Sequence, residues 1–101
     1  MSKIITPYEL DGSGDRFETV AVGGSSGQSA AITTTRIGIV NPLSAASAAD
    51  IVYVAFGTNP TATTSSFALP TGMSEFNIVS GWKVAVISGG TTSKITIVEL
   101  V

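Results

Sequence analysis

The sequence contains no cysteine and no histidine among its 101 residues. Without cysteine, disulfide bonds, zinc–thiolate sites and thiol catalysis are excluded. Without histidine, Ser-His and Cys-His nucleophilic machinery is excluded as well. A pair of carboxylates could still support hydrolysis, but no spacing of the acids marks such a pair. The composition therefore predicts a protein that is not an enzyme, with no cofactor and no metal site.

Charged residues are also scarce, at 12% of the chain against about 25% in average globular proteins. The formal net charge is −2 and the five cations are scattered, so we expect no binding to nucleic acid. Four of the seven acids, Glu9, Asp11, Asp15 and Glu18, lie near the start and are expected to be solvated. A free soluble monomer has a denser charge pattern, so we expect another molecule to cover part of the surface.

Long apolar runs are missing too. None reaches the length of a membrane span, and the first residues lack the apolar core of a secretory signal. We therefore expect no membrane binding, and synthesis and folding in a cytoplasm.

Strand patterns recur along the chain, separated by turn-forming residues at short intervals. Apolar runs and alternation predict strands at 17–22, 30–40, 50–56, 66–69, 75–79, 82–87 and 93–101. The apolar face changes partway along 30–40, which predicts a bulge near Thr34 to Arg36. Residues 44–50 are expected to form a loop with a short helical turn. The spacing predicts an all-β fold, a compact antiparallel β-sandwich or barrel of about seven strands.

Residues 17–101 are predicted to form this single domain, preceded by an N-terminal arm, residues 1–16. Tight turns predict two hairpins, which pair 75–79 with 82–87 and 82–87 with 93–100. The predicted core consists of Phe17, Ile32, Ile37, Ile39, Val52, Val54, Phe56, Leu69, Phe76, Ile78, Trp82, Val84, Val86, Ile95 and Ile97.

Three stretches could suggest ligand sites. Residues 23–29, GGSSGQS, lack the Lys-Ser/Thr pair and the following helix of a phosphate-binding loop, so a flexible connection is expected. Residues 11–15, DGSGD, lack the closing Glu of a calcium loop, so a polar turn is expected. Tyr8, Tyr53 and Trp82 could form a sugar-stacking platform, but the alternating pattern around Trp82 favours its burial in the core.

The stretch 54–70, VAFGTNPTATTSSFALP, contains no strong nucleophile, base or metal ligand. Together with the later EFNI, GWKVAVISGG and KITIVEL, it resembles small structural proteins of tailed bacteriophages, over about the last half of the chain. The matching residues are Gly57, Asn59, Pro60, Ala62, Thr63, Leu69, Pro70, Gly72, Phe76, Gly81, Lys83, Val84, Ala85, Val86, Ile87, Ile97 and Glu99. The resemblance implies a virion component, most naturally a capsid decoration or cement protein, and no catalytic residues.

From that resemblance we expect a protein on the capsid surface of the virion, bound to the major capsid protein and to itself as a homo-oligomer, a trimer. The alternative hypothesis is a glycan-binding module of a phage tail tip or fibre. Within 54–70 the expected contact residues are Asn59, Thr61, Thr63 and Thr64, on an exposed connection between two strands. In the arm they are Ile4, Ile5 and Tyr8, which would reach a neighbouring subunit or the capsid while adding little to the domain's own core.

Overall fold

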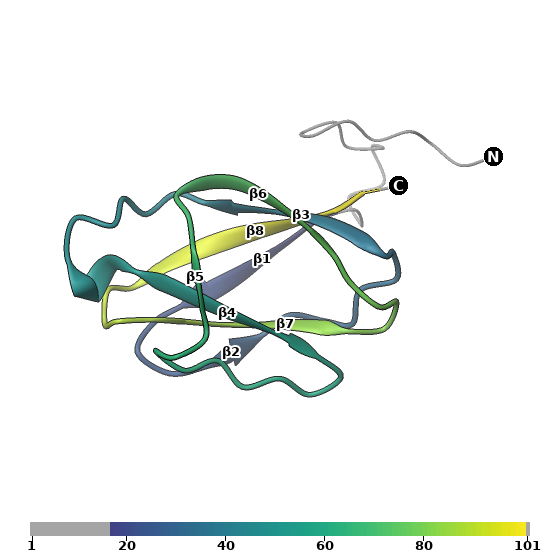
Figure 1. The fold of residues 1–101 in the computed structure, drawn as a ribbon, viewed down its shortest axis with the longest axis horizontal. Helices are drawn as coiled ribbons and strands as arrows, with labels where there is room; N and C mark the ends of the chain where they lie inside the picture. The colour runs from purple at the N-terminus through teal and green to yellow at the C-terminus, as the bar shows by residue number, and fades with distance from the viewer. Residues whose placement is uncertain (1–16, 101) are drawn as a thin grey trace.

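Eight strands and one short helical turn make up the part of the chain that the computed structural model describes, residues 17–100 (Figure 1). They are β1 (Phe17–Val22), β2 (Gly27–Gln28), β3 (Arg36–Asn41), η1 (Ala48–Asp50), β4 (Val52–Gly57), β5 (Phe67–Leu69), β6 (Gly72–Asn77), β7 (Lys83–Ser88) and β8 (Ser93–Leu100). The expected short helical turn is therefore present as η1. Residues 1–16, the predicted arm, lie outside the described part.

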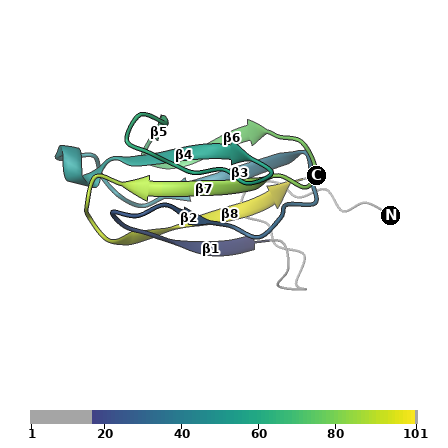
Figure 2. The same ribbon diagram turned by 90° about the horizontal axis from the view of Figure 1, so that it is seen from below.

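The strands form two antiparallel four-stranded sheets that face each other (Figure 2). Sheet A has the order β1-β8-β3-β6, and sheet B has the order β2-β7-β4-β5. The prediction of an all-β antiparallel sandwich is confirmed. Val, Ile and Thr are frequent in β1, β3, β7 and β8, because their branched side chains pack well on a pleated surface.

The main core fills the space between the sheets, where alternate residues of each strand point inward. It contains Val20, Val22, Ile32, Ile37, Ile39, Val52, Val54, Leu69, Ile78, Val84, Val86, Ile95 and Ile97, with Leu43, Phe56, Phe76 and Trp82 packed against it. Phe17 was wrongly predicted to be in this core. It is 39% exposed, because the inward positions of β1 are those of Val20 and Val22, and Phe17 has the opposite parity.

Both predicted hairpins are wrong. β6 pairs with β3 in sheet A, whereas β7 pairs with β2 and β4 in sheet B. β8 returns to sheet A, where it pairs with β1 and β3. The tight turns at 78–82 and 88–92 therefore carry the chain from one sheet to the other. This arrangement lets the apolar faces of successive strands meet across the core, which a flat hairpin would not allow.

The predicted strand 30–40 is divided between the sheets. Ser29 N donates to Val84 O and Ile32 N donates to Trp82 O, both at 2.8 Å, so this part runs along the strand β7 of sheet B. Only from Arg36 does the chain pair in sheet A, as β3. The change of apolar face marks this crossing and not a bulge. The expected flexible connection at 23–29 also contains the short strand β2.

Candidate interaction surface

The β4–β5 connection, residues 58–66, crosses the outward face of sheet B as a strap (Figure 1). β2 and β5 are opposite edges of this sheet, yet Gln28 of β2 is bonded to the strap. Gln28 Nε2 donates to Asn59 Oδ1 at 2.9 Å and to Pro60 O at 2.7 Å. Ala62 N also donates to Ser26 Oγ at 2.9 Å. The connection is therefore held in place over the sheet and is not a free loop.

Small side chains make room for the strap. Gln28, Ala85 and Ala55 form one row across β2, β7 and β4, with side chains on the outward face. Ala85 is nevertheless fully buried, and Ala62 of the strap is only 2% exposed. Larger residues at 55 and 85 would push the strap away from the sheet. The two alanines therefore allow the strap to lie close to the outward face of sheet B.

The strap alternates between buried and exposed residues. Pro60 and Ala62 are buried, whereas Thr61, Thr63 and Thr64 are exposed. Thr63 also organises a turn: its carbonyl accepts from Ser66 N at 2.9 Å, and its N–H donates to Ser66 Oγ at 3.0 Å. The structure thus brings three of the expected contact residues together on an ordered, outward-facing segment.

The other expected contact residues are placed differently. Asn59 is exposed, but its side-chain oxygen is engaged by Gln28, so its visible role is to hold the strap. Ile4, Ile5 and Tyr8 lie outside the described residues, as does the DGSGD turn.

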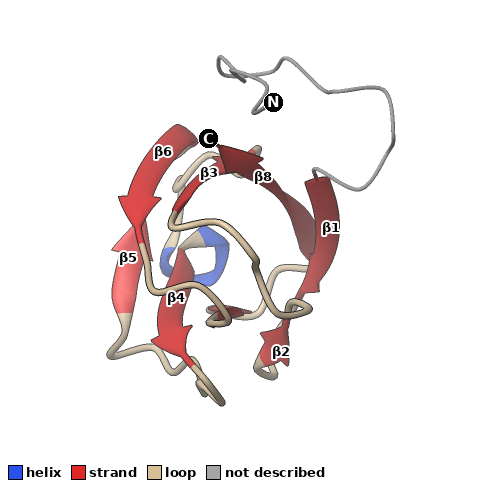
Figure 3. Ribbon diagram, turned by 90° about the vertical axis from the view of Figure 1, so that its right-hand side faces the viewer, coloured by secondary structure: helices blue, strands red, loops and turns tan. Residues whose placement is uncertain are grey.

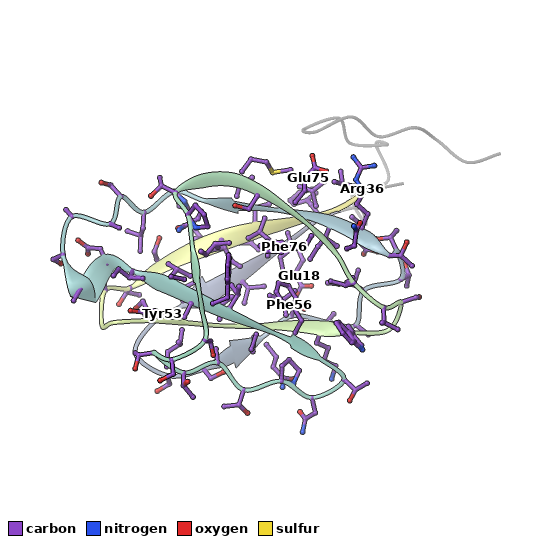
Figure 4. The ribbon with its side chains drawn as sticks, viewed as in Figure 1. Glu18, Arg36, Tyr53, Phe56, Glu75 and Phe76 are labelled. Carbon is purple, nitrogen blue, oxygen red and sulfur yellow. The ribbon has the colours of Figure 1, made fainter. Side chains whose placement is uncertain are left out.

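Three phenylalanines line one side of the sandwich, where the edge strands β5 and β6 lie one beyond the other (Figure 3). The ring centroids of Phe56 and Phe76 are 5.0 Å apart, and those of Phe67 and Phe76 are 5.9 Å apart at 88°. Phe67 directly follows the strap and is 55% exposed. We call these three residues the aromatic seam. It joins the two sheets through ring contacts, among them that between Phe56 and Phe76 (Figure 4), and it leaves the ring of Phe67 open to a partner.

Two inward-facing acids join the sheets elsewhere, and sequence reasoning missed both roles. The Glu18 carboxylate accepts from Ala30 N, at 3.1 and 3.0 Å to its two oxygens. Glu99 Oε1 accepts from Thr33 N at 3.0 Å and from Thr33 Oγ1 at 2.9 Å. Both acids therefore fasten the segment that crosses between the sheets. Glu18, which was expected to be solvated, is half-buried, and its carboxylate is bonded to this segment.

The aromatic residues considered for sugar stacking do not form a platform within the described part. Trp82 packs against the main core, as expected. Tyr53 is half-buried on the outward face of sheet B, opposite Ile87 of β7 and Ala68 of β5. Tyr8 lies outside the described residues.

Within residues 17–100, no group of three or more Asp and Glu side chains is placed to hold a metal ion. None of the helical segments in this range has the length and apolar character needed to cross a bilayer.

No protein-family model matches the chain, and comparisons with curated proteins and with solved structures found no significant match. The similarity to phage structural proteins thus remains an expectation from the sequence. Any function has to be argued from the strap, the aromatic seam and the composition.

Proposed function

We propose that this chain is a non-enzymatic structural protein that binds other proteins through the strap side of its sandwich. More specifically, we propose a capsid decoration or cement protein of a tailed phage, which binds the major capsid protein and associates with itself. Added contact area between neighbouring capsid subunits would stiffen the shell, at on the order of 800 Å² per partner for a standard interface.

The observation that carries the proposal is the arrangement of the strap. Hydrogen bonds donated by Gln28 and accepted by Ser26 hold it in one position before any partner arrives. Thr61, Thr63 and Thr64 face outward from it, and Phe67 begins the next strand. Short side chains lose little rotamer entropy when they are buried in an interface. A backbone that is already held in one position loses little further conformational entropy on binding. A half-exposed aromatic ring beside them is a typical anchor of protein interfaces.

Two further features support the proposal. The surface has few charges, which suits repeated close packing on a shell. The sequence motifs of the strap and of the strands after it resemble those of phage structural proteins, and this resemblance is the only support for the virion location.

The test is co-sedimentation of purified protein with bare heads of the phage that encodes it, over a range of protein concentrations. We expect saturable binding that the triple variant T61A/T63A/T64A and the single variant Phe67→Ser weaken at least about tenfold, since interface anchors contribute 1.4 kcal/mol or more. Lys94→Ala, on the outward face of the other sheet, is the matched control and should bind like the unchanged chain.

A parallel titration against host surface polysaccharide tests the glycan-binding alternative. Saturable binding to the polysaccharide without binding to heads would replace the capsid proposal by the tail-tip or fibre hypothesis. Binding to neither partner would leave the capsid proposal without support.

A further inference from the structure

The outward face of sheet A carries a second apolar cluster, separate from the main core. Val98 and Leu100 of β8 form this cluster, and they are only 4% and 1% exposed. The register places Phe17 and Gly38 on either side of Val98, and Arg36 beside Leu100. Since Ile95 and Ile97 belong to the main core, the cluster has the opposite, outward parity.

Gly38 lies at the centre of this face, where a glycine is unfavourable for a strand. The Cε of Met73 occupies the space that a Cβ at residue 38 would fill, and Leu100 Cδ1 lies 3.7 Å from that position. Met73 and Leu100 thus lie against Gly38, Val98 is its partner in the register, and Phe17 lies on the other side of Val98. We call Phe17, Met73, Val98 and Leu100 the sheet A patch. Within residues 17–100, the second layer of the sandwich lies on the other side of sheet A, so no described strand packs on the patch (Figure 3).

The N-terminal segment that lies outside the described part joins the domain at this patch. Residues 1–16 lead into Phe17, which is itself a patch residue opposite Val98. Because β1 and β8 are antiparallel and Phe17 is opposite Val98, β1 begins near the Leu100 end of β8. Any segment tethered there has an effective concentration of about millimolar at the patch, without the need for a second molecule.

The sequence of this segment fits a return over the sheet. Residues 11–15, DGSGD, are strong turn formers, and they separate residues 4–10, IITPYEL, from β1. The residues 4–10 contain Ile4, Ile5, Tyr8 and Leu10 as apolar side chains. Seven extended residues span about 23 Å. The four strands of a sheet are about 14 Å across from first to last axis, so the segment is long enough to cross the patch.

We propose that residues 4–10 of this chain dock on its own sheet A patch, as the cover of Val98 and Leu100. The occupant is the same molecule's segment, because the tether begins at the patch. This inference does not depend on the proposed function. It differs from the expectation that the arm adds little to the domain itself, because the arm would complete a second small core.

Thiol labelling tests the proposal cleanly, because the chain has no cysteine of its own. The single-cysteine variant Val98→Cys is labelled with a charged maleimide in the full chain and in a full chain that also carries I4S/I5S. We expect the serine substitutions to raise the labelling rate about tenfold or more, because they release the cover. Lys94→Cys, which is exposed on the same face of β8, is the control and should react at the same rate in both chains.

Deleting residues 2–10 should have the same effect on Val98→Cys while β-type circular dichroism is retained. An unchanged labelling rate in the I4S/I5S chain would overturn the proposal. So would a labelling rate of Val98→Cys in the otherwise unchanged chain that rises on dilution, since that result would assign the cover to a second copy.

Discussion

The ring of Phe67 meets the ring of Phe76 edge-on, with centroids 5.9 Å apart and an interplanar angle of 88°. The two residues come from edge strands of different sheets, so this contact joins the layers where neither sheet has a further strand among residues 17–100. Edge-to-face packing is a favoured geometry for aromatic pairs. Phe76 also contacts Phe56, so it is the central ring of the aromatic seam.

Phe76→Ala should lower the free energy of unfolding by about 3 kcal/mol, because it removes the central ring and leaves a cavity. Phe67→Ala is the matched control: its ring is 55% exposed, so we expect a loss of about 1 kcal/mol or less. Urea denaturation followed by circular dichroism measures both. Equal losses would show that Phe76 is not the central ring.

Gln28→Ala should loosen the strap, because it removes the hydrogen bonds to Asn59 and Pro60. We expect a stability loss of about 1–2 kcal/mol and faster proteolytic cleavage within residues 58–66. Limited proteolysis with mass spectrometry locates the cut. Thr64→Ala, an exposed change within the strap itself, should leave the cleavage rate unchanged.

Gly89→Ala should destabilise the far end of the sandwich. A Cβ there would collide with Ala48 O and would lie 2.9 Å from Ala49 Cα, both backbone atoms of η1. Gly89 N and Thr91 N also donate to the segment around η1, at 3.1 Å each, so it cannot move away freely. We expect a cost of about 1–3 kcal/mol in thermal unfolding. Gly24→Ala, where the added carbon meets nothing within 4 Å, should be neutral or slightly stabilising.

Two acids of sheet A should differ in their contributions. Glu99→Ala leaves the N–H and hydroxyl of Thr33 without their carboxylate and should cost about 1–2 kcal/mol. Glu75→Ala removes an ion pair with Arg36 at 3.0 Å whose side chains are 41% and 42% exposed (Figure 4), so we expect a loss below about 0.5 kcal/mol. Chemical denaturation of the two variants in the same buffer compares them, and a larger loss for Glu75→Ala would contradict this ranking.

Self-association should be detectable in the isolated protein. The sparse charge and the half-exposed Phe67 lead us to expect a discrete oligomer in sedimentation velocity at micromolar concentration. Phe67→Ser should shift the distribution towards monomer. A monomer at every concentration would remove the homo-oligomer, whereas binding to the capsid could still be tested separately.

The positions of the strands along the chain could be predicted from the sequence more readily than which strands pair with each other. Alternation located β1 at its observed bounds and β7 and β8 to within a residue. The turn at Ser80-Gly81 has the same residue chemistry whether it closes a hairpin or carries the chain to the other sheet. What decides between these is where the apolar faces of β6, β7 and β8 can be buried, and that depends on the whole fold.

The candidate surface was predictable only in part. Exposure of Thr61, Thr63 and Thr64 followed from their polar character, but nothing local to residues 58–66 revealed the bonds to Gln28, about thirty residues earlier. The role of Glu99 did have a signal in the sequence. It continues the inward parity of Ile95 and Ile97, and an acid at such a position needs a hydrogen-bonding partner.

The position of β8 in sheet A has a consequence for biosynthesis. β8 is the last described strand to leave the ribosome, yet it lies between β1 and β3. Until it emerges, β1 has no hydrogen-bonded neighbour in its sheet, and Val20 and Val22 can pack only against the strands of sheet B. Contacts between residues this far apart in sequence form late and slowly. Completion of sheet A in the nascent chain therefore depends on β8, and we expect a chain that stops before Ser93 to leave β1 and β3 without the strand that joins them.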